Sequence, residues 1–469
     1  MPSEVWVRIN SDQLAYFSLL QLAELLADGR LSAQQLAGVF TSRLRRFDSL
    51  LHPVVTLTTE LANQQAAAAQ AALQAANTSA AASTRSSSTS PKSSMLHNIS
   101  LLTGVPYGLK DLMAVPGYST SWGLSQLRNR TINEPSAAYS ALSAAGGVLL
   151  AKTATGELAW GDVWFNGITT RNPWNINTGS CGSSAGSAVA VAAGLLPFAV
   201  GTETWGSIVC PASTVGVTAY RPTGGSISGQ GTMQVAPSLD KTGMFCRQLL
   251  DCAVVADALM DQQQQQQQQH AINASHAAPQ LRLHRQPAAA AASFNYTQHQ
   301  QTLQQTPPST LLQQQQQQQY RQRGLLLPPT LQQLPALSSL CIGYLRGTSS
   351  NLVAALMRQQ PRCVKGPLQP PGNNQLVQDV LSVILQAEVA VSLEGLWLEG
   401  YIDQDSHWYP LIQLGQVAPA SAYLKAQRLR SVLAAQTRHY FAANGIDVLL
   451  KPTKSKAVTD FHEVHPILV

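Results

Sequence analysis

The sequence predicts an α/β protein, and two observations support this prediction. Between residues 101 and 260, short apolar runs that suit buried strands alternate with a run that suits a helix. GVLLAKT, from Gly147, and FAVGTE, from Phe198, are predicted as strands, and SAVAVAAGLL as a helix starting near Ser187. Such alternation is typical of α/β folds. The chain has 469 residues, 45% of them hydrophobic, so it can also bury a large core.

The N-terminal part is predicted to be helical from residue 16 to residue 76. Apolar residues recur there at helical spacing in two runs, and an Ala-rich stretch from Leu61 to Ala76 indicates a long third helix. The two runs are Leu19, Leu22, Leu25 and Leu26, then Leu36, Val39, Phe40 and Leu44. Residues 77–94 are Ser/Ala-rich and of low complexity, so we expect a disordered insertion there.

Residues 261–336 interrupt the alternating pattern. Gln262–Gln269 and Gln313–Gln319 are polyglutamine tracts, with Pro and Ala runs between them. A structureless stretch of this length does not belong inside a compact core. We therefore predict a Gln-rich, disordered surface insertion without a catalytic role. The ordered chain resumes at LCIGYL, a predicted strand, and continues to a helix around Ala420–Asn444 and the strand-like IDVLLKP.

Composition and charge argue against several classes of protein. Charged residues make up 12% of the chain, and the net charge of +6 includes no dense basic run, so no nucleic-acid partner is expected. The sequence contains neither a signal-peptide pattern nor an apolar run long enough to span a membrane. None of the six cysteines forms a CxxC pair, which argues against a zinc site. Such sparse cysteine suits a reducing compartment, and we predict a cytoplasmic location.

Three features that can support catalysis crowd into one stretch. They are GVPYGLKDL, which contains Lys110, the loop GSCGSSAGS from Gly179, and GTETWGSIVCPAS, which contains Ser207. Loops of small residues let backbone N–H groups approach a ligand closely, and such groups can hold an anion or a developing oxyanion. The stretch is therefore the candidate active site.

Three known motifs can be compared with the Gly/Ser loop, and only one of them matches its sequence. The loop lacks the Lys of a phosphate-binding P-loop and the glycine spacing of a dinucleotide fingerprint. Gly182–Gly186 does match the GxSxG nucleophile elbow, with Ser184 as nucleophile. An elbow needs a strand directly before it, however, and RNPWNINTGSC is predicted as a loop. It also needs a histidine, and the candidates lie far along the chain: His407, His439, His462 and His465.

Lysine is the simpler local base. No histidine lies between His97 and His270, whereas the block contains Lys110, Lys152 and Lys241. Burial can lower a lysine pKa toward neutrality, and a neutral amine can activate a serine. The sequence therefore favours a Ser–Lys arrangement.

At these residues the chain resembles the amidase signature family of amide hydrolases. The resemblance rests on GVPYGLKDL, on GSCGSSAGSAVAVAAGLLPFAVGTETWGSIVCPAS and on GVTAYRPT. It implies a triad in which Lys110 is the base, Ser183 is held by a cis peptide bond and Ser207 is the nucleophile. It also implies one domain over residues 10–469 that is short at its C-terminus, with a mixed, twisted sheet surrounded by helices.

The mechanism that the resemblance implies is a proton relay. Neutral Lys110 would take a proton from Ser183, which takes the Ser207 proton as Ser207 attacks the carbonyl of a small-molecule amide. Backbone N–H groups of Thr204, Trp205, Gly206 and Ser207 would bind the oxyanion. No metal or organic cofactor is required.

Other residues near the triad are expected to have supporting roles. Ser184 is expected to hold the loop or cap the following helix, next to the substrate site. Glu203 is expected to brace the oxyanion loop, and Trp205, where many family members have Gly, could wall the acyl pocket. Cys181 and Cys210 are expected as buried packing.

Structural and functional alternatives remain at this stage. Lys110 could pair with Asp111, and Lys152 could be a rival base or pair with Glu157 or Asp162. Besides a stand-alone amidase, the chain could be the glutaminase component of a glutamyl-tRNA amidotransferase, an inactive truncated homologue, or an elbow-type esterase.

Overall fold

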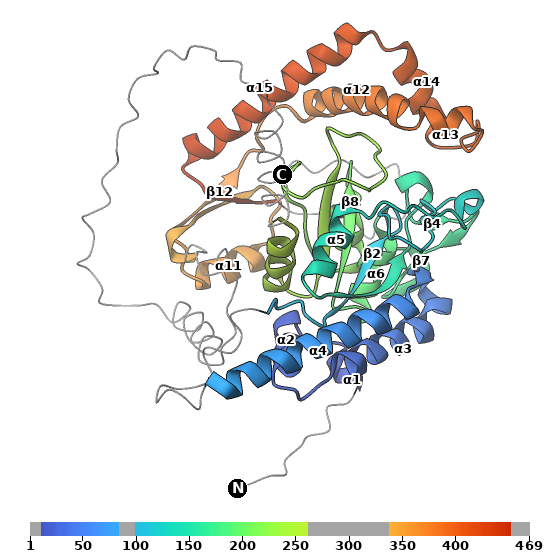
Figure 1. Cartoon of the computed structure of the whole chain (residues 1–469). Helices are drawn as coiled ribbons and strands as arrows, with labels where there is room; N and C mark the ends of the chain where they lie inside the picture. Colours follow the sequence, from blue (N-terminus) through green and yellow to red (C-terminus); the bar gives the residue numbers. More distant parts are fainter. Residues whose placement is uncertain (1–10, 84–98, 261–336, 452–469) are drawn as a thin grey trace, which may run out of the picture.

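Six strands form a mixed sheet at the centre of the molecule (Figure 1). The computed structural model describes residues 11–83, 99–260 and 337–451. The strand order is β1-β3-β2-β8-β10-β9, in which β2 runs parallel to both β3 and β8, whereas the other pairs are antiparallel. The bounds are β1 Val54–Leu57, β2 Pro106–Lys110, β3 Val148–Thr153, β8 Phe198–Glu203, β9 Thr218–Tyr220 and β10 Lys241–Cys246. The expected α/β fold with a mixed sheet is confirmed.

The inner strands are apolar because they are covered on both faces. Every residue of β2 and β3 is buried, as is usual for parallel strands flanked by helices. The predicted strands agree with β3 and β8, and the predicted helix is α6 (Ala185–Ala192), which begins slightly earlier than expected. Strand β1 was not predicted, because its four residues lie between two long helical patterns.

The N-terminal helices start where the sequence supplies caps. Ser18 and Gln21 form a capping box at the start of α2, and Ser32 and Gln35 form another at the start of α3. Each box satisfies two backbone N–H groups that a helix start would otherwise leave unpaired. The helices are α1 Ser11–Leu14, α2 Leu19–Ala27, α3 Ala33–Leu51 and α4 Thr59–Ser83, and α3 and α4 pack against β3.

Helix α4 corrects one predicted boundary. It runs to Ser83, so residues 77–83 of the expected Ser/Ala-rich insertion are helical, because the Ala-rich repeat continues into them. Residues 84–94 and the whole Gln-rich segment 261–336 lie outside the described residues.

Short elements lie between β2 and β10 along the chain. They are η1 Ser125–Leu127, α5 Ala137–Ala144, η2 Glu157–Ala159, β4 Val163–Trp164, β5 Ile168–Thr169, β6 Arg171–Asn172, β7 Asn175–Gly179 and α7 Val209–Val215, with η1 and α5 between β2 and β3. The segment predicted as a loop before Ser180 contains the antiparallel pair β6–β7. That prediction was wrong, because polar two-residue and five-residue strands carry no apolar alternation.

The C-terminal part adds a second sheet and a group of helices. Strands β11 and β13 match the predictions from LCIGYL and IDVLLKP, and α15 spans the predicted Ala420–Asn444. Figure 1 shows α12, α14 and α15 above the central sheet. The elements are η3 Leu337–Ser339, β11 Cys341–Leu345, α11 Ser350–Arg358, β12 Cys363–Leu368, α12 Asn374–Ser392, α13 Glu394–Leu398, α14 Tyr409–Val417, α15 Ala420–Asn444 and β13 Val448–Leu450.

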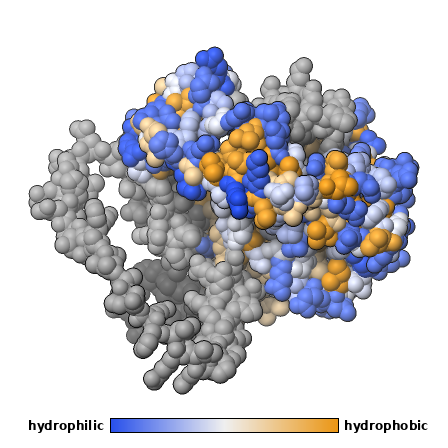
Figure 2. Space-filling model, turned by 90° about the horizontal axis from the view of Figure 1, so that it is seen from above, coloured by the Kyte–Doolittle hydropathy of each residue, from blue (hydrophilic) through white to orange (hydrophobic). Residues whose placement is uncertain are grey.

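Two hydrophobic cores organise the molecule. The larger one surrounds the central sheet, and the second joins residues 112–239 to the C-terminal helices through side chains such as Leu158, Val235 and Ile384. Seen from above, the surface mixes polar and hydrophobic residues (Figure 2). Exposed apolar side chains of α12–α15 are Leu376, Val391, Leu398, Leu414, Val417, Leu424 and Val432.

The cysteines differ from expectation. All six are paired, as Cys181–Cys210, Cys246–Cys252 and Cys341–Cys363, so Cys181 and Cys210 are not simple packing residues. Disulfides persist in oxidising surroundings, so this pairing does not support the inference of a reducing compartment. No helix among the described residues is long and apolar enough to cross a membrane.

Candidate active site

Two parallel strands place a lysine and a threonine side by side. Lys110 is the last residue of β2, and Thr202 is near the end of the neighbouring β8. Because Leu109 lies opposite Val200 in a parallel pair, the carboxyl ends of both strands meet at one edge of the sheet. Lys110 Nζ accordingly lies 2.9 Å from Thr202 Oγ1.

Lys110 is fully buried among hydroxyl groups. Its Nζ lies 2.8 Å from Ser183 Oγ and 3.0 Å from Ser184 Oγ, and it forms no ion pair with any described residue. Burial lowers the pKa of the Lys110 amine well below its usual range, and the charges of Asp240 and Glu203 oppose this to a smaller extent. The site therefore favours the neutral amine.

The neighbouring hydrogen bonds are compatible with a neutral Lys110 amine. Ser184 Oγ donates its single hydrogen to Thr202 O at 2.9 Å, so it can only accept from Lys110. A neutral amine has two hydrogens, which Ser184 Oγ and Thr202 Oγ1 accept. Lys110 Nζ also lies within hydrogen-bond distance of Ser183 Oγ, at 2.8 Å. If the two hydrogens of a neutral amine go to Ser184 and Thr202, this third contact is left for the lone pair, which could then accept the Ser183 proton. This is the orientation that a base at Lys110 requires.

Close backbone packing holds the serine loop in place. The Gly182–Ser183 peptide bond is cis, as the resemblance implied. A Cβ at Gly182 would lie 1.9 Å from Gly161 O, so only glycine fits there. Ser184 N donates to Ser207 O at 3.2 Å, which ties the serine loop to the turn that carries Ser207.

The turn after β8 leaves backbone donors free beside Ser207. Glu203 Oε2 accepts from Ile208 N at 2.9 Å and from Val209 N at 3.0 Å, so Glu203 braces the loop as expected. Within the described part of the chain, the N–H groups of Trp205, Gly206 and Ser207 have no hydrogen-bond acceptor. These three groups are the candidates for an oxyanion hole.

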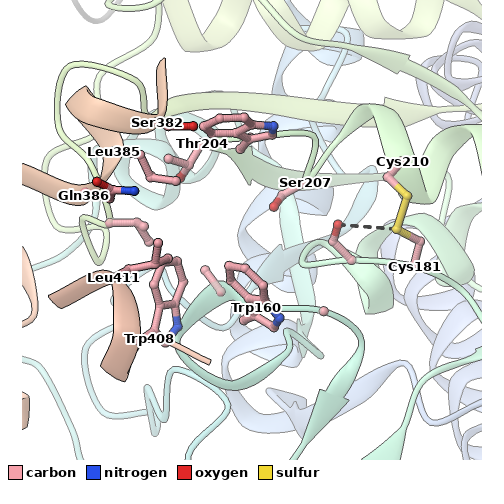
Figure 3. Close-up of a pocket in the computed structure, with 15 residues that line it drawn as sticks. Trp160, Cys181, Thr204, Ser207, Cys210, Ser382, Leu385, Gln386, Trp408 and Leu411 are labelled. Carbon is pink, nitrogen blue, oxygen red and sulfur yellow. Dashed lines mark hydrogen bonds between the residues drawn. A yellow bond between two sulfur atoms is a disulfide. The ribbon is translucent and has the colours of Figure 1, made fainter. Parts of the chain in front are cut away.

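Ser207 opens onto a cavity of about 290 Å³. Figure 3 shows its hydroxyl facing this space, with Trp160 and Trp408 on one side and Leu385 and Gln386 across from it. The lining residues are Ala159, Trp160, Gly161, Cys181, Gly182, Thr204, Trp205, Ser207, Cys210, Val235, Ser382, Leu385, Gln386, Trp408 and Leu411. Of the residues expected to bind the oxyanion or substrate, Thr204 and Trp205 line the cavity, whereas Gly206 is not among its lining residues.

The predicted site residues are therefore gathered, with two qualifications. No hydrogen bond joins the Ser183 and Ser207 hydroxyls within the described structure. Ser184 does not line the cavity, and its side chain forms no capping bond to α6; it holds Lys110 and Thr202 instead. Its position supports the loop-holding role and not the cap.

The rival bases have other partners. Lys152 is fully buried and pairs with Asp111 at 2.6 Å, not with Glu157 or Asp162, because β2 and β3 place both side chains at adjacent strand ends. Asp111 is therefore not a partner of Lys110. Of the described histidines, His407 stacks on Trp160 and none bonds to Ser184 or Ser207.

Sequence reasoning missed part of this site. Thr202 lies two residues before the predicted oxyanion loop, and its place in β8 beside β2 could have revealed it. The far wall of the cavity comes from α12 and α14, whose sequences carry no polar motif, so no local signal could have found Ser382, Leu385 or Gln386.

Comparison with known proteins places these features in a family. The model of the Amidase family matches residues 34–366. The A-type component of the glutamyl-tRNA(Gln) amidotransferase of Pseudomonas fluorescens (strain Pf0-1) is 36% identical over 246 residues, which is 52% of this chain and 46% of that protein. The corresponding protein of Roseiflexus castenholzii is 35% identical over 244 residues, with the same coverage. The chain thus spans about half the length of the curated relatives it matches.

Solved structures share the fold at low sequence identity. The peptide amidase from Stenotrophomonas maltophilia matches with a TM-score of 0.65 and 24% identity, covering 93% of this chain and 83% of that one. A 6-aminohexanoate cyclic dimer hydrolase matches with a TM-score of 0.63 and 20% identity over 94% and 80%. Since the family model spans well over half of the sequence, the chain belongs to the Amidase family.

Proposed function

We propose that this protein hydrolyses carboxylic amides at a non-peptide C–N bond through an acyl-enzyme on Ser207. The observation that carries the proposal is the buried Lys110 amine, whose Nζ lies 2.8 Å from Ser183 Oγ. A buried amine without a carboxylate partner is unfavourable as a cation, and as a neutral base it can serve serine chemistry.

The first half of the reaction forms the acyl-enzyme. Ser207 Oγ attacks the amide carbonyl carbon while its proton passes to Ser183 Oγ, and the Ser183 proton passes to Lys110 Nζ. The tetrahedral oxyanion accepts hydrogen bonds from the free N–H groups of the turn 204–207. Collapse breaks the C–N bond, and the reverse relay delivers the proton to the leaving amine.

The second half regenerates the enzyme. Water takes the place of the amine, loses its proton through the same relay and attacks the ester carbonyl on Ser207, which releases the carboxylic acid. The relay requires the Ser207 hydroxyl to turn toward Ser183 when substrate binds, since the two hydroxyls are not bonded without it. Catalytic hydrogen bonds often tighten only in the substrate complex.

A second function uses the same residues. The curated relatives are A-type components of glutamyl-tRNA(Gln) amidotransferases, and this favours glutamine as an alternative amide, with a partner protein to receive the ammonia. Release of ammonia from glutamine only in the presence of such a partner would support this second function.

The test is mass spectrometry of a covalent adduct. A fluorophosphonate probe should label Ser207, and Ser207→Ala should abolish both labelling and amide hydrolysis. Ser184→Ala should still form the adduct, with slower turnover, because Ser184 only holds Lys110. An adduct on Ser184 would instead support an elbow-type esterase, and a folded chain that forms no adduct would be an inactive homologue.

A further inference from the structure

The cavity wall at Ser207 is uncharged. Of the described residues that line it, none has an ionisable side chain, because Cys181 and Cys210 are joined in a disulfide. Its apolar members are Ala159, Trp160, Trp205, Val235, Leu385, Trp408 and Leu411. Burying an unpaired charge against such a wall is strongly unfavourable.

The aromatic part of this wall is held rigidly. Trp160 packs edge-on against Trp408 at 5.0 Å and stacks on His407 at 5.4 Å between ring centroids. Trp408 is almost fully buried, so its ring cannot swing out of the cavity without breaking the second core. Fixed indole rings favour flat, apolar groups, which can stack on them or meet their edges.

The size of the cavity sets the size of the group. A cavity of about 150 Å³ is enough to hold benzene in a protein interior. The cavity here is about 290 Å³, so one aromatic ring with a short linker fits within it.

The acyl side of the amide is the side that enters the cavity. The leaving amine must lie toward the Ser183 hydroxyl, which supplies its proton, and Gly182, next to Ser183, lines the cavity at its Ser207 end. The group on the other side of the carbonyl therefore extends toward α12. Figure 3 shows Ser382 and Gln386 there, across the cavity from Ser207.

We propose that the preferred substrates are amides whose acyl group is uncharged and carries one aromatic ring. Gln386 contacts the end of this group that lies farthest from Ser207 and so contributes to specificity. This inference rests on the proposed function. Amino-acid amides such as glutamine, which carry an ammonium and a carboxylate on the acyl side, are then poor substrates.

A matched pair of substrates tests the charge rule. The para-nitro and para-carboxylate derivatives of phenylacetamide have nearly the same size and shape and differ by one charge at the end that meets Gln386. We expect kcat/KM to be at least about 100-fold lower for the carboxylate, because its charge is desolvated without a partner. Equal turnover of the two amides, or faster turnover of L-glutamine than of phenylacetamide, would overturn the inference.

A charge placed at Gln386 tests the position. In Gln386→Arg, the ratio of kcat/KM between the neutral substrate and the para-carboxylate should fall by about tenfold or more, because a guanidinium pairs with a carboxylate. This ratio is the penalty on the carboxylate. Gln416→Arg adds the same charge at an exposed position of α14 away from the cavity and should leave the penalty unchanged. An unchanged penalty in a folded Gln386→Arg variant would contradict the assignment of Gln386.

Failure of the inference differs from failure of the proposed function. Hydrolysis of glutamine but not of phenylacetamide, with an adduct on Ser207, would contradict the inferred acyl preference but support the proposed mechanism. Absence of a Ser207 adduct, together with no turnover of either amide, would overturn the proposed function and the inference with it.

Discussion

Because Lys110 Nζ is buried with hydroxyl partners and without a carboxylate, the proposed mechanism couples activity to pH. Burial lowers the pKa of the amine, and the relay needs the neutral form, so kcat/KM should rise with pH through that pKa and then level off. Lys110→Met should lower kcat by about 10²- to 10⁴-fold and remove this rise. A pH–rate profile of both proteins checks the prediction.

Stability gives a second readout for the same residue. Between the lowered pKa of folded Lys110 and the ordinary pKa near 10.5, the unfolded chain binds one more proton than the folded one. The free energy of unfolding therefore increases with pH across that window, and this contribution should vanish in Lys110→Met. Lys425→Met removes an exposed lysine of α15 and should change neither profile. A Lys110→Met enzyme with normal kcat would refute the role of Lys110 as base.

At the scale of single residues, the sequence motifs indicated the candidate catalytic residues but not the side chains that contact them. Lys110, Ser183 and Ser207 were singled out, among several polar side chains in the same segments, by the resemblance of these segments to the amidase signature. The partners of Lys110 could not, since Asp111 is adjacent in sequence yet its side chain pairs with Lys152. Successive side chains in a strand point to opposite faces, so Lys110 and Asp111 were poorly placed to pair.

At the scale of elements, the Cys181–Cys210 disulfide joins the serine loop to α7, and it lines the cavity beside Ser207. It closes a loop of 29 residues, for which chain entropy gives about 3–4 kcal/mol of stabilisation. Replacing both cysteines by Ala should lower stability by an amount of this order. It should also lower kcat, because the loop that holds Ser183 is released from the turn that holds Ser207. Denaturant unfolding and steady-state kinetics measure the two effects.

The control is a second disulfide far from the cavity. Cys341–Cys363 spans 22 residues between β11 and β12, so Ala at both positions should cost a similar stability but leave kcat per folded enzyme unchanged. Equal kcat losses in the two double variants would show that the active-site disulfide acts through global stability alone.

This pairing marks a limit of sequence reasoning about elements. Long strands and helices could be predicted from periodicity, but Cys181 and Cys210 carry no sign of their proximity. They come within 6.0 Å between Cα atoms only because the turn after β8 folds back onto the serine loop. Contacts between loops depend on the tertiary structure, which local patterns do not encode.

At the scale of the whole molecule, the cavity is completed by two distant parts of the chain. Its near wall comes from residues 159–235 and its far wall from residues 382–411. In the sequence, these two groups are separated by the segment 261–336. The proposed triad was expected from one continuous block of sequence. The far wall could not be predicted, because it exists only where α12 and α14 pack on that block.

A polar contact beside the second core holds the two walls together. Glu388 of α12 accepts from Ser238 N at 2.8 Å and from Tyr423 OH at 2.9 Å, and Arg430 donates to Ser238 Oγ at 2.9 Å. Glu388→Ala removes the carboxylate at the centre of this network. Because the network is partly exposed, we expect a stability loss of only about 1–2 kcal/mol.

The effect of Glu388→Ala on catalysis should fall mainly on KM. None of the proposed catalytic residues Lys110, Ser183 and Ser207 belongs to the C-terminal helices. The rate of the chemical step should therefore change little, whereas a looser far wall binds the acyl group less well. We expect KM for phenylacetamide to rise several-fold with kcat within about twofold of the parent. Glu394→Ala, which removes an exposed glutamate of α13, should leave both constants unchanged. If Glu388→Ala lowered kcat and left KM untouched, the C-terminal helices would act on the triad and not on the acyl pocket.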